Sequence, residues 1–479
     1  MNVSRPVQRA LAAAIALLLA GNGAALALIE RPTTSVDRDI RQPRASTGAA
    51  KKVTPPKEWD PRITKLADYV ESERGLQFDH PVAVSFLDDD AYRKEISSAE
   101  TSELSAEDKE EIKIFTGQAR ALGLLRKDTD LVDATSQVVD EGTLAFYDPE
   151  RDLMVVKGTK LTVGVKVTVV HELTHALQDQ HFDLTKEFED DGSESIHHAL
   201  VEGDAVRIER AYASEELNGK ETRDYVNEQQ EAIDDADLGD IPPALLQLFT
   251  APYQLGAPMT MIVAEEQGQD ALDKLFRSPP DSDEGTINPF ALLDRERSAK
   301  VGKPALRAGE AATDDGDFGV LTWYVVLASF IDFRTAIDAV DGWSGDAYAG
   351  YTKGGRACLR AHFVGDTEKD AREMEAALLR WKEAFPPEGV AVTRTGERVE
   401  LDACEPDTVP KPAESAANAL TLPAARLEIV ASVLAEGASL DVARCFSREF
   451  VRLVDLDSLD EEDPSAFNEL GAAMREKCL

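Results

Sequence analysis

Basic residues are scarce in this chain of 479 residues, in which 52 Lys and Arg stand against 90 Asp and Glu and the net charge is −38. Nucleic-acid binding depends on clustered Lys and Arg that neutralise phosphate groups, and anionic lipid surfaces attract the same cations. The composition therefore argues against nucleic acid and against an anionic membrane surface as partners. We expect the excess of acidic groups to serve solubility.

Long apolar runs are also missing after the first residues of the chain. Arg5 and Arg9 precede a short apolar run over 11–20, and small residues follow at 25–27. This order is typical of a cleaved secretory signal, so we predict a signal peptide over 1–27 and a protein that is secreted or held in the cell envelope. No later stretch is long and apolar enough to span a bilayer, and we expect no stable membrane span once the signal is removed.

Cysteine is rare and is confined to the last third of the chain, at Cys358, Cys404, Cys445 and Cys478. An even count in an exported chain predicts two disulfides, for which three pairings are possible. Proximity in sequence favours Cys358 with Cys404 and Cys445 with Cys478. Because none lies near residues 171–198, which hold most of the histidines, we expect no Cys-ligated metal site.

The distribution of apolar residues divides the remaining chain. Residues 28–60 lack apolar periodicity and are expected to form a flexible leader. Residues 61–404 are long enough for one large domain with its own core, and within it the short apolar run 320–333 predicts a buried helix. The Pro-containing stretch 405–419 predicts a linker, and the helical periodicity of 420–479 predicts a small helical C-terminal domain.

The segment His171-Glu172-Leu173-Thr174-His175 has the pattern H-E-x-x-H. In a helix, residues four apart lie about 40° apart on one face, so both imidazoles can bind one Zn²⁺ while Glu172 acts as a base on water. The β-branched residues upstream favour a strand on propensity, but a strand would place the two imidazoles about 13 Å apart. We therefore predict a largely buried helix over 162–180.

Zinc in such a site needs a third protein ligand, and two residues compete for this role. His181 has the ten-residue spacing of the H-E-x-x-H-x-x-G-x-x-H pattern, but Gln178 replaces the Gly at which that chain turns back to the metal. Glu202 lies on a second predicted helix, 194–215, among apolar residues where an unpaired carboxylate is costly. Gly203 beside it permits close approach of another helix. We therefore predict Glu202 as the third ligand.

The segments HELTHALQDQHFDL (171–184) and ALVEGDA (199–205) resemble zincin metallopeptidases of the gluzincin type. They resemble more closely a group of poorly characterised bacterial secreted or lipoprotein zinc peptidase-like proteins. The resemblance covers residues 60 to 405, because further similar segments lie at 67–76, 82–87, 144–149, 278–280 and 342–346. A departure lies at 283–289, where the group has a His before the Pro and this chain has Asn288, which puts any role of that His in doubt here.

The resemblance implies an α+β fold in which residues 61–404 form a zincin-like catalytic domain. This domain would contain a small mixed sheet, an active-site helix with H-E-x-x-H and a second helix with the Glu ligand. It also implies an exported zinc endopeptidase in which His171, His175 and Glu202 hold Zn²⁺ and Glu172 is the general base for a zinc-activated water. Carboxylates usually orient such imidazoles, and we name two candidates for this role, Asp179 and Asp204.

An oxyanion stabiliser is also expected, and the sequence leaves three residues open for this role: Tyr147, Tyr253 and His198. The stretch 144–156 predicts a β-hairpin with its turn at 148–149. In zincins the sheet edge beside the active-site helix pairs with an extended substrate, so the expected partner is a peptide or protein. The alternative is an envelope protein that keeps the zincin fold for binding or structure without efficient catalysis. The intact motif favours the peptidase.

Overall fold

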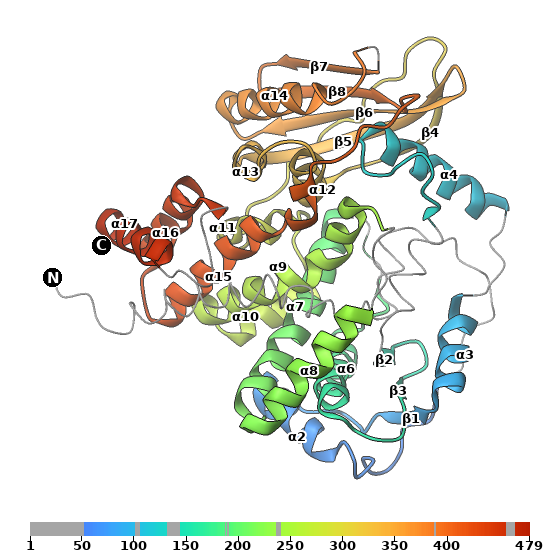
Figure 1. Cartoon of the computed structure of the whole chain (residues 1–479), viewed down its shortest axis with the longest axis vertical. Helices are drawn as coiled ribbons and strands as arrows, with labels where there is room; N and C mark the ends of the chain where they lie inside the picture. The colour runs from blue at the N-terminus through green and yellow to red at the C-terminus, as the bar shows by residue number, and fades with distance from the viewer. Residues whose placement is uncertain are drawn as a thin grey trace.

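The computed structural model describes residues 52–100, 106–131, 144–186, 188, 191–235, 241–387, 389–456 and 465–479. The predicted signal peptide over 1–27 and most of the predicted leader lie outside the described residues. The described chain mixes helices and strands, which confirms the α+β class. Figure 1 shows two sheets at opposite ends of the molecule, with long helices between them.

The smaller sheet contains the predicted hairpin. Its strands are β1 (Ala83–Leu87), β2 (Ala145–Asp148) and β3 (Leu153–Lys157), in the order β1-β3-β2. β1 runs parallel to β3, whereas β2 runs antiparallel to β3. The turn between β2 and β3 includes Asp152 at a positive φ of 54°. The hairpin is therefore confirmed, and β2 is an edge strand of a mixed sheet.

The helix α6 (Val163–Phe182) carries the H-E-x-x-H segment and packs against β2. The Thr162 side chain caps its N-terminus by accepting a hydrogen bond from the Val165 N–H, and the helix ends at Asp183 with a φ of 58°. The predicted span of 162–180 agrees with this helix to within two residues. Most of its side chains are buried, so tertiary packing on several sides overrides the strand propensity of its valines.

The helix that carries Glu202 is α7 (Asp191–Glu215), which begins three residues before the predicted start. It packs against α6 and against α9 (Pro243–Gln267), and at one crossing the two backbones touch. A Cβ atom on Gly203 would lie 2.1 Å from the carbonyl carbon of Gly256. Gly203 therefore does permit close approach of another helix, and this helix is α9.

Six further α-helices of the described residues precede position 300. They are α2 (Thr64–Arg74), α3 (Asp89–Glu100), α4 (Ala106–Ala121), α8 (Gly219–Asp235), α10 (Gln269–Arg277) and α11 (Pro289–Asp294). Two of them hold α6 directly: α2 packs along it, and the Glu228 carboxylate of α8 accepts hydrogen bonds from the Gly164 N–H and the Thr162 hydroxyl.

The larger sheet is antiparallel and has the order β4-β5-β6-β8-β7. Its strands are β4 (Ala311–Gly316), β5 (Trp343–Lys353), β6 (Arg356–Gly365), β7 (Val390–Thr395) and β8 (Arg398–Cys404), with the helix α14 (Glu368–Lys382) packed against it. We did not predict this sheet from the sequence. β6 is buried along most of its length, so the alternating pattern that identifies a half-exposed strand is lost.

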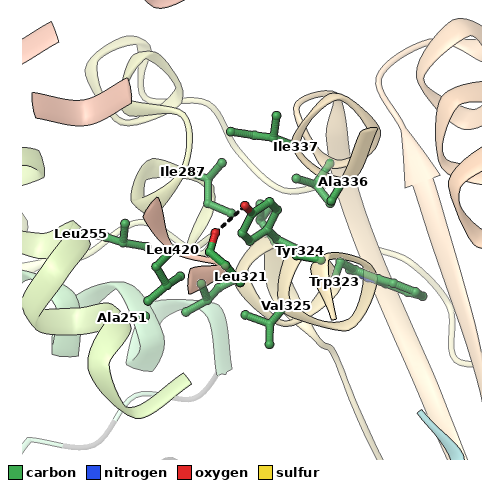
Figure 2. Packing of buried hydrophobic residues seen from close by; sticks show 14 of the residues in the cluster. Ala251, Leu255, Ile287, Leu321, Trp323, Tyr324, Val325, Ala336, Ile337 and Leu420 are labelled. Carbon is green, nitrogen blue, oxygen red and sulfur yellow. Dashed lines mark hydrogen bonds between the residues drawn. The ribbon is translucent and has the colours of Figure 1, made fainter. Parts of the chain in front are cut away.

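The apolar run predicted as one buried helix over 320–333 forms α12 (Gly319–Ala328), and the chain then turns into α13 (Phe333–Val340). A new helix begins there because the Asp332 side chain accepts a hydrogen bond from the Thr335 N–H and caps the N-terminus of α13. α12 is almost completely buried, as predicted, and Figure 2 shows its side chains packed between residues of α9, α13 and the segment at Leu420. The Tyr324 hydroxyl donates a hydrogen bond to the Ala419 carbonyl within this core.

Both predicted disulfides are confirmed. Cys358 and Cys404 are directly opposite each other on β6 and β8. Cys445 and Cys478 join α16 (Leu440–Leu453) to α17 (Ser465–Cys478). Two disulfides in one chain indicate an oxidising, extracytoplasmic environment.

The C-terminal helices pack on the rest of the chain through α15 (Thr421–Ala435), which lies against α9. The segment predicted as a linker over 405–419 is held there, because the Gln247 amide donates to the Ala417 carbonyl and accepts from the Leu420 N–H. The division into domains stays a prediction.

Among the described residues, one helical stretch, 414–435, is long and apolar enough to cross a bilayer, but 67% of its most apolar window is buried, as in a core helix of a soluble protein.

Candidate metal centre

Three buried side chains from two helices converge on one point. His171 and His175 project from α6, and Glu202 projects from α7. The two imidazole Nε2 atoms are 3.0 Å apart, and each lies 3.3 Å from Oε2 of Glu202. None of the three residues is more than 4% exposed. The structure thus brings together the three predicted ligands in a group that can hold a metal ion.

The other ring nitrogen of each imidazole has its own acceptor. Nδ1 of His171 lies 3.2 Å from Oε2 of Glu209, and Nδ1 of His175 lies 3.0 Å from Oε1 of Gln178. These acceptors favour a proton on Nδ1, so that the Nε2 lone pairs face each other and the Glu202 oxygen. Three electron-pair donors this close repel one another unless a cation or a proton lies between them. The donor set therefore fits a divalent cation that accepts both nitrogen and oxygen ligands.

The predicted carboxylate partners of the imidazoles were wrong in detail. Asp179 accepts a hydrogen bond from the Tyr147 hydroxyl, 2.9 Å away, and Asp204 reaches His175 only through Gln178. The residues that contact the rings directly are Glu209 and Gln178, neither of which we predicted for this role. Glu209 follows Glu202 by seven residues, or two helical turns, which places both on one face of α7 and is a signal that the sequence does contain.

His181 lies outside the group, in agreement with the preference for Glu202. Its Nε2 atom lies 2.8 Å from the Gln77 carbonyl oxygen in an exposed position near the end of α6. The helix continues through position 178 without the turn that a glycine provides in the ten-residue pattern. The side chain therefore cannot swing back towards the other two histidines.

The predicted base, Glu172, lies next to the ligands and is itself buried. Its Oε2 atom accepts a hydrogen bond of 2.8 Å from the Tyr147 N–H on the edge strand β2. Burial raises the pKa of Glu172 to about 7, against the lowering influence of the two imidazoles. A carboxylate with a pKa near neutrality is suited to take up and release a proton at neutral pH.

The ligands form a strongly coupled cluster of charges. Burial lowers the pKa of His171, but hydrogen bonding to Glu202 and Glu209 outweighs it and raises the pKa well above its usual range. Burial raises the pKa of Glu202, but the charge of His175 and hydrogen bonds to the neighbouring imidazoles hold it well below its usual range. A proton and a metal cation would therefore compete for the same lone pairs.

The three candidates for an oxyanion stabiliser have different surroundings. The Tyr147 hydroxyl is held by Asp152 and Asp179, at 3.1 and 2.9 Å. The Tyr253 ring is stacked near the His171 ring, with centroids 6.4 Å apart. His198 lies with its Nε2 atom 3.7 Å from Oε1 of Glu202, the oxygen that does not face the other imidazoles. Tyr253 and His198 are therefore beside the ligands, whereas the Tyr147 hydroxyl is held by carboxylates.

The segment 342–346, which carries part of the family resemblance, and the segment 283–289, which departs from it, both have structural roles. The Asp283 carboxylate accepts hydrogen bonds from the first N–H groups of α12, at Val320 and Leu321. Asp346 accepts the indole N–H groups of Trp323 and Trp343. Asn288, which replaces the His of the resembling group, caps α11 and donates to Glu284. This position thus has a structural role here.

Comparisons of this chain with protein-family models, with curated proteins and with solved structures find no match.

Proposed function

We propose that this protein is an exported zinc-dependent metallopeptidase that hydrolyses peptide bonds, with Glu172 as general base. The observation that carries the proposal is the buried convergence of His171, His175 and Glu202 beside that carboxylate. Two imidazoles and one carboxylate are a donor set that zinc accepts in catalytic sites, where a fourth position stays open. When bound, zinc would lower the pKa of water towards neutrality and polarise the scissile carbonyl.

Glu172 is the residue that would move the proton. As a carboxylate it would accept a proton from the attacking water, and as a carboxylic acid it would pass that proton to the leaving amine. Its hydrogen bond to the Tyr147 N–H keeps one oxygen fixed, so the side chain has a defined orientation before substrate binds.

The edge strand β2 supports a peptide as the substrate. The outward N–H of Tyr147 reaches Glu172, so the outer edge of the strand faces the helix that carries the ligands. An extended peptide would be recognised through its main chain along such an edge once it is exposed, and because the first three residues of β2 are buried, this proposal requires the edge to open to the substrate. The scissile bond would then lie next to the base and the ligands.

A second candidate function is a zincin-like envelope protein that binds metal without efficient proteolysis. The observation that favours it is burial, because His171, Glu172, His175 and Glu202 are at most 4% exposed in the described structure. A peptidase must admit a polypeptide to these residues, whereas a structural metal site has no such requirement.

Zinc content and peptide cleavage of the full chain separate the two functions. We expect the wild type and Glu172→Gln to carry zinc equally. We expect the variant to cleave a diverse peptide library at least about 100-fold more slowly than the wild type. Glu397→Gln, in the exposed turn between β7 and β8, is the matched control and should keep full activity. A zinc-loaded wild type that cleaves nothing would refute the peptidase and favour the second candidate.

A further inference from the structure

We propose that Gln178 is a positioning residue that holds the His175 ring in its metal-binding tautomer, and that the buried ion pair Arg74–Asp204 fixes Gln178 for this task. The inference rests on the proposed metal site. In the H-E-x-x-H-x-x-G-x-x-H pattern the position of Gln178 is a glycine that turns the chain. In this protein the residue at that position contacts the ring of His175 instead.

The orientation of the Gln178 amide follows from its neighbours. Its Nε2 atom lies 3.1 Å from the Val201 carbonyl oxygen and 3.2 Å from Oδ2 of Asp204. A carbonyl and an ionised carboxylate are both acceptors only, so the NH₂ end of the amide must face them. The oxygen end must then face His175, whose Nδ1 atom lies 3.0 Å from Oε1.

Two guanidinium groups hold the Asp204 carboxylate in place as an acceptor. This carboxylate is completely buried and makes ion pairs with Arg74, at 2.6 Å, and with Arg207, at 2.8 Å. Arg74 is fixed in turn by Asp273 on α10, again at 2.6 Å. The amide of Gln178 therefore rests on a rigid buried network that joins α2, α7 and α10.

The tautomer of His175 follows from the fixed oxygen. A neutral imidazole carries one N–H and one lone pair, and either nitrogen can hold the proton. Because Oε1 of Gln178 accepts only, Nδ1 of His175 must donate, which leaves the lone pair on Nε2 facing His171 and Glu202. Loss of this acceptor would allow the proton to move to Nε2, where it blocks metal binding.

Four versions of the full chain test this role: the wild type, Gln178→Leu, Gln178→Glu and Gln180→Leu. Leu removes the acceptor and keeps the bulk, whereas Glu keeps an acceptor oxygen but sets a second carboxylate against Asp204. Gln180 is the matched control, because it lies two residues further along α6 and serves Asp79 and His80 instead. Zinc affinity is measured by competition with a chelator, stability by urea unfolding without metal, and the His175 tautomer by NMR of ¹⁵N-labelled histidine.

We expect zinc affinity to fall roughly 10–100-fold in Gln178→Leu and to stay near the wild-type value in Gln178→Glu and Gln180→Leu. Without metal, Gln178→Glu should be less stable than Gln178→Leu, because Glu brings two buried carboxylates together. A purely structural role would make affinity follow stability, and that result would overturn the inference, as would wild-type affinity in Gln178→Leu.

The NMR measurement separates this inference from the proposed function. His175 of the wild type should carry its proton on Nδ1 with or without zinc, and Gln178→Leu should shift protons to Nε2. A wild type with Nε2–H at His175 refutes the inference even if the protein is an active peptidase. Conversely, the expected tautomer in a protein that cleaves no peptide supports the inference and refutes only the peptidase.

Discussion

Replacing Gly203 with Ala tests whether the contact between α7 and α9 positions the Glu202 ligand. The added Cβ would lie 2.1 Å from the Gly256 carbonyl carbon and 2.3 Å from its oxygen. Carbon atoms pack at about 3.5–4.0 Å, so the helices would have to separate by about 1.4 Å or more at this point. Neither contact atom is the end of a flexible side chain, so the backbone itself would have to move.

Two quantities should change together. Overpacking of this kind costs about 1–3 kcal/mol of the free energy of unfolding, which urea unfolding of the metal-free protein measures. A ligand displaced by more than 1 Å cannot keep a metal–oxygen distance of about 2.0–2.2 Å, so zinc affinity should fall at least about tenfold. Chelator competition measures the second quantity.

Gly219→Ala is the control for the glycine substitution itself. Gly219 begins α8, and the nearest atom to an added Cβ is the end of the Arg223 side chain at 3.8 Å. Ala at this position should leave stability equal or slightly higher, because it reduces the conformational entropy of the unfolded chain. Wild-type zinc affinity and stability in Gly203→Ala would refute the view that backbone contact between α7 and α9 sets the position of Glu202.

Two further predictions concern stability alone. Burial, with nearby carboxylates such as Glu296, raises the pKa of Glu284 to about 9, so the folded state holds this proton more tightly than the unfolded chain. The free energy of unfolding should therefore fall by up to several kcal/mol as pH rises from about 4.5 to about 9. Urea unfolding of Glu284→Gln should lack this part of the pH dependence. Equal pH profiles for the wild type and the variant would contradict the raised pKa. Replacing both Cys445 and Cys478 with Ser should cost about 3–4 kcal/mol, because the disulfide closes a loop with a sequence separation of 33 residues. An unchanged urea midpoint would show that the packing of α17 holds without it.

The parts of the fold that the sequence predicted are governed by short-range patterns. The H-E-x-x-H spacing requires a helix if both imidazoles are to meet, and the hairpin over 144–156 follows from turn residues between two apolar runs. In the five-stranded sheet, the central strand β6 is buried along most of its length and shows no alternation, whereas β8 alternates buried and partly exposed residues and could have been recognised. Two of its pairings are hairpins with two-residue turns, at Lys353–Arg356 and at Thr395–Arg398, and these turns are local signals that we missed. Only the β4–β5 and β6–β8 pairings join segments separated by other elements, which no local pattern encodes.

The candidate metal site also contains residues that local spacing predicts and residues that only packing brings together. Helical spacing together with the cost of burying a lone carboxylate was enough to select His171, His175 and Glu202. The partners of the rings were harder, because a carboxylate near a ligand in sequence is not necessarily near it in space. Asp179 follows His175 by one helical turn, yet it binds the Tyr147 hydroxyl of the neighbouring sheet.

The sequence by itself therefore determined which residues can bind a metal, because donor atoms four apart on a helix share a face whatever surrounds them. It also indicated the disulfide pairs, since each joins cysteines close in the chain. Only the tertiary structure decided how the donors are oriented. The acceptors at Glu209 and Gln178, and the approach of α7 to α9 at Gly203, depend on packing between segments that come together only when the chain folds.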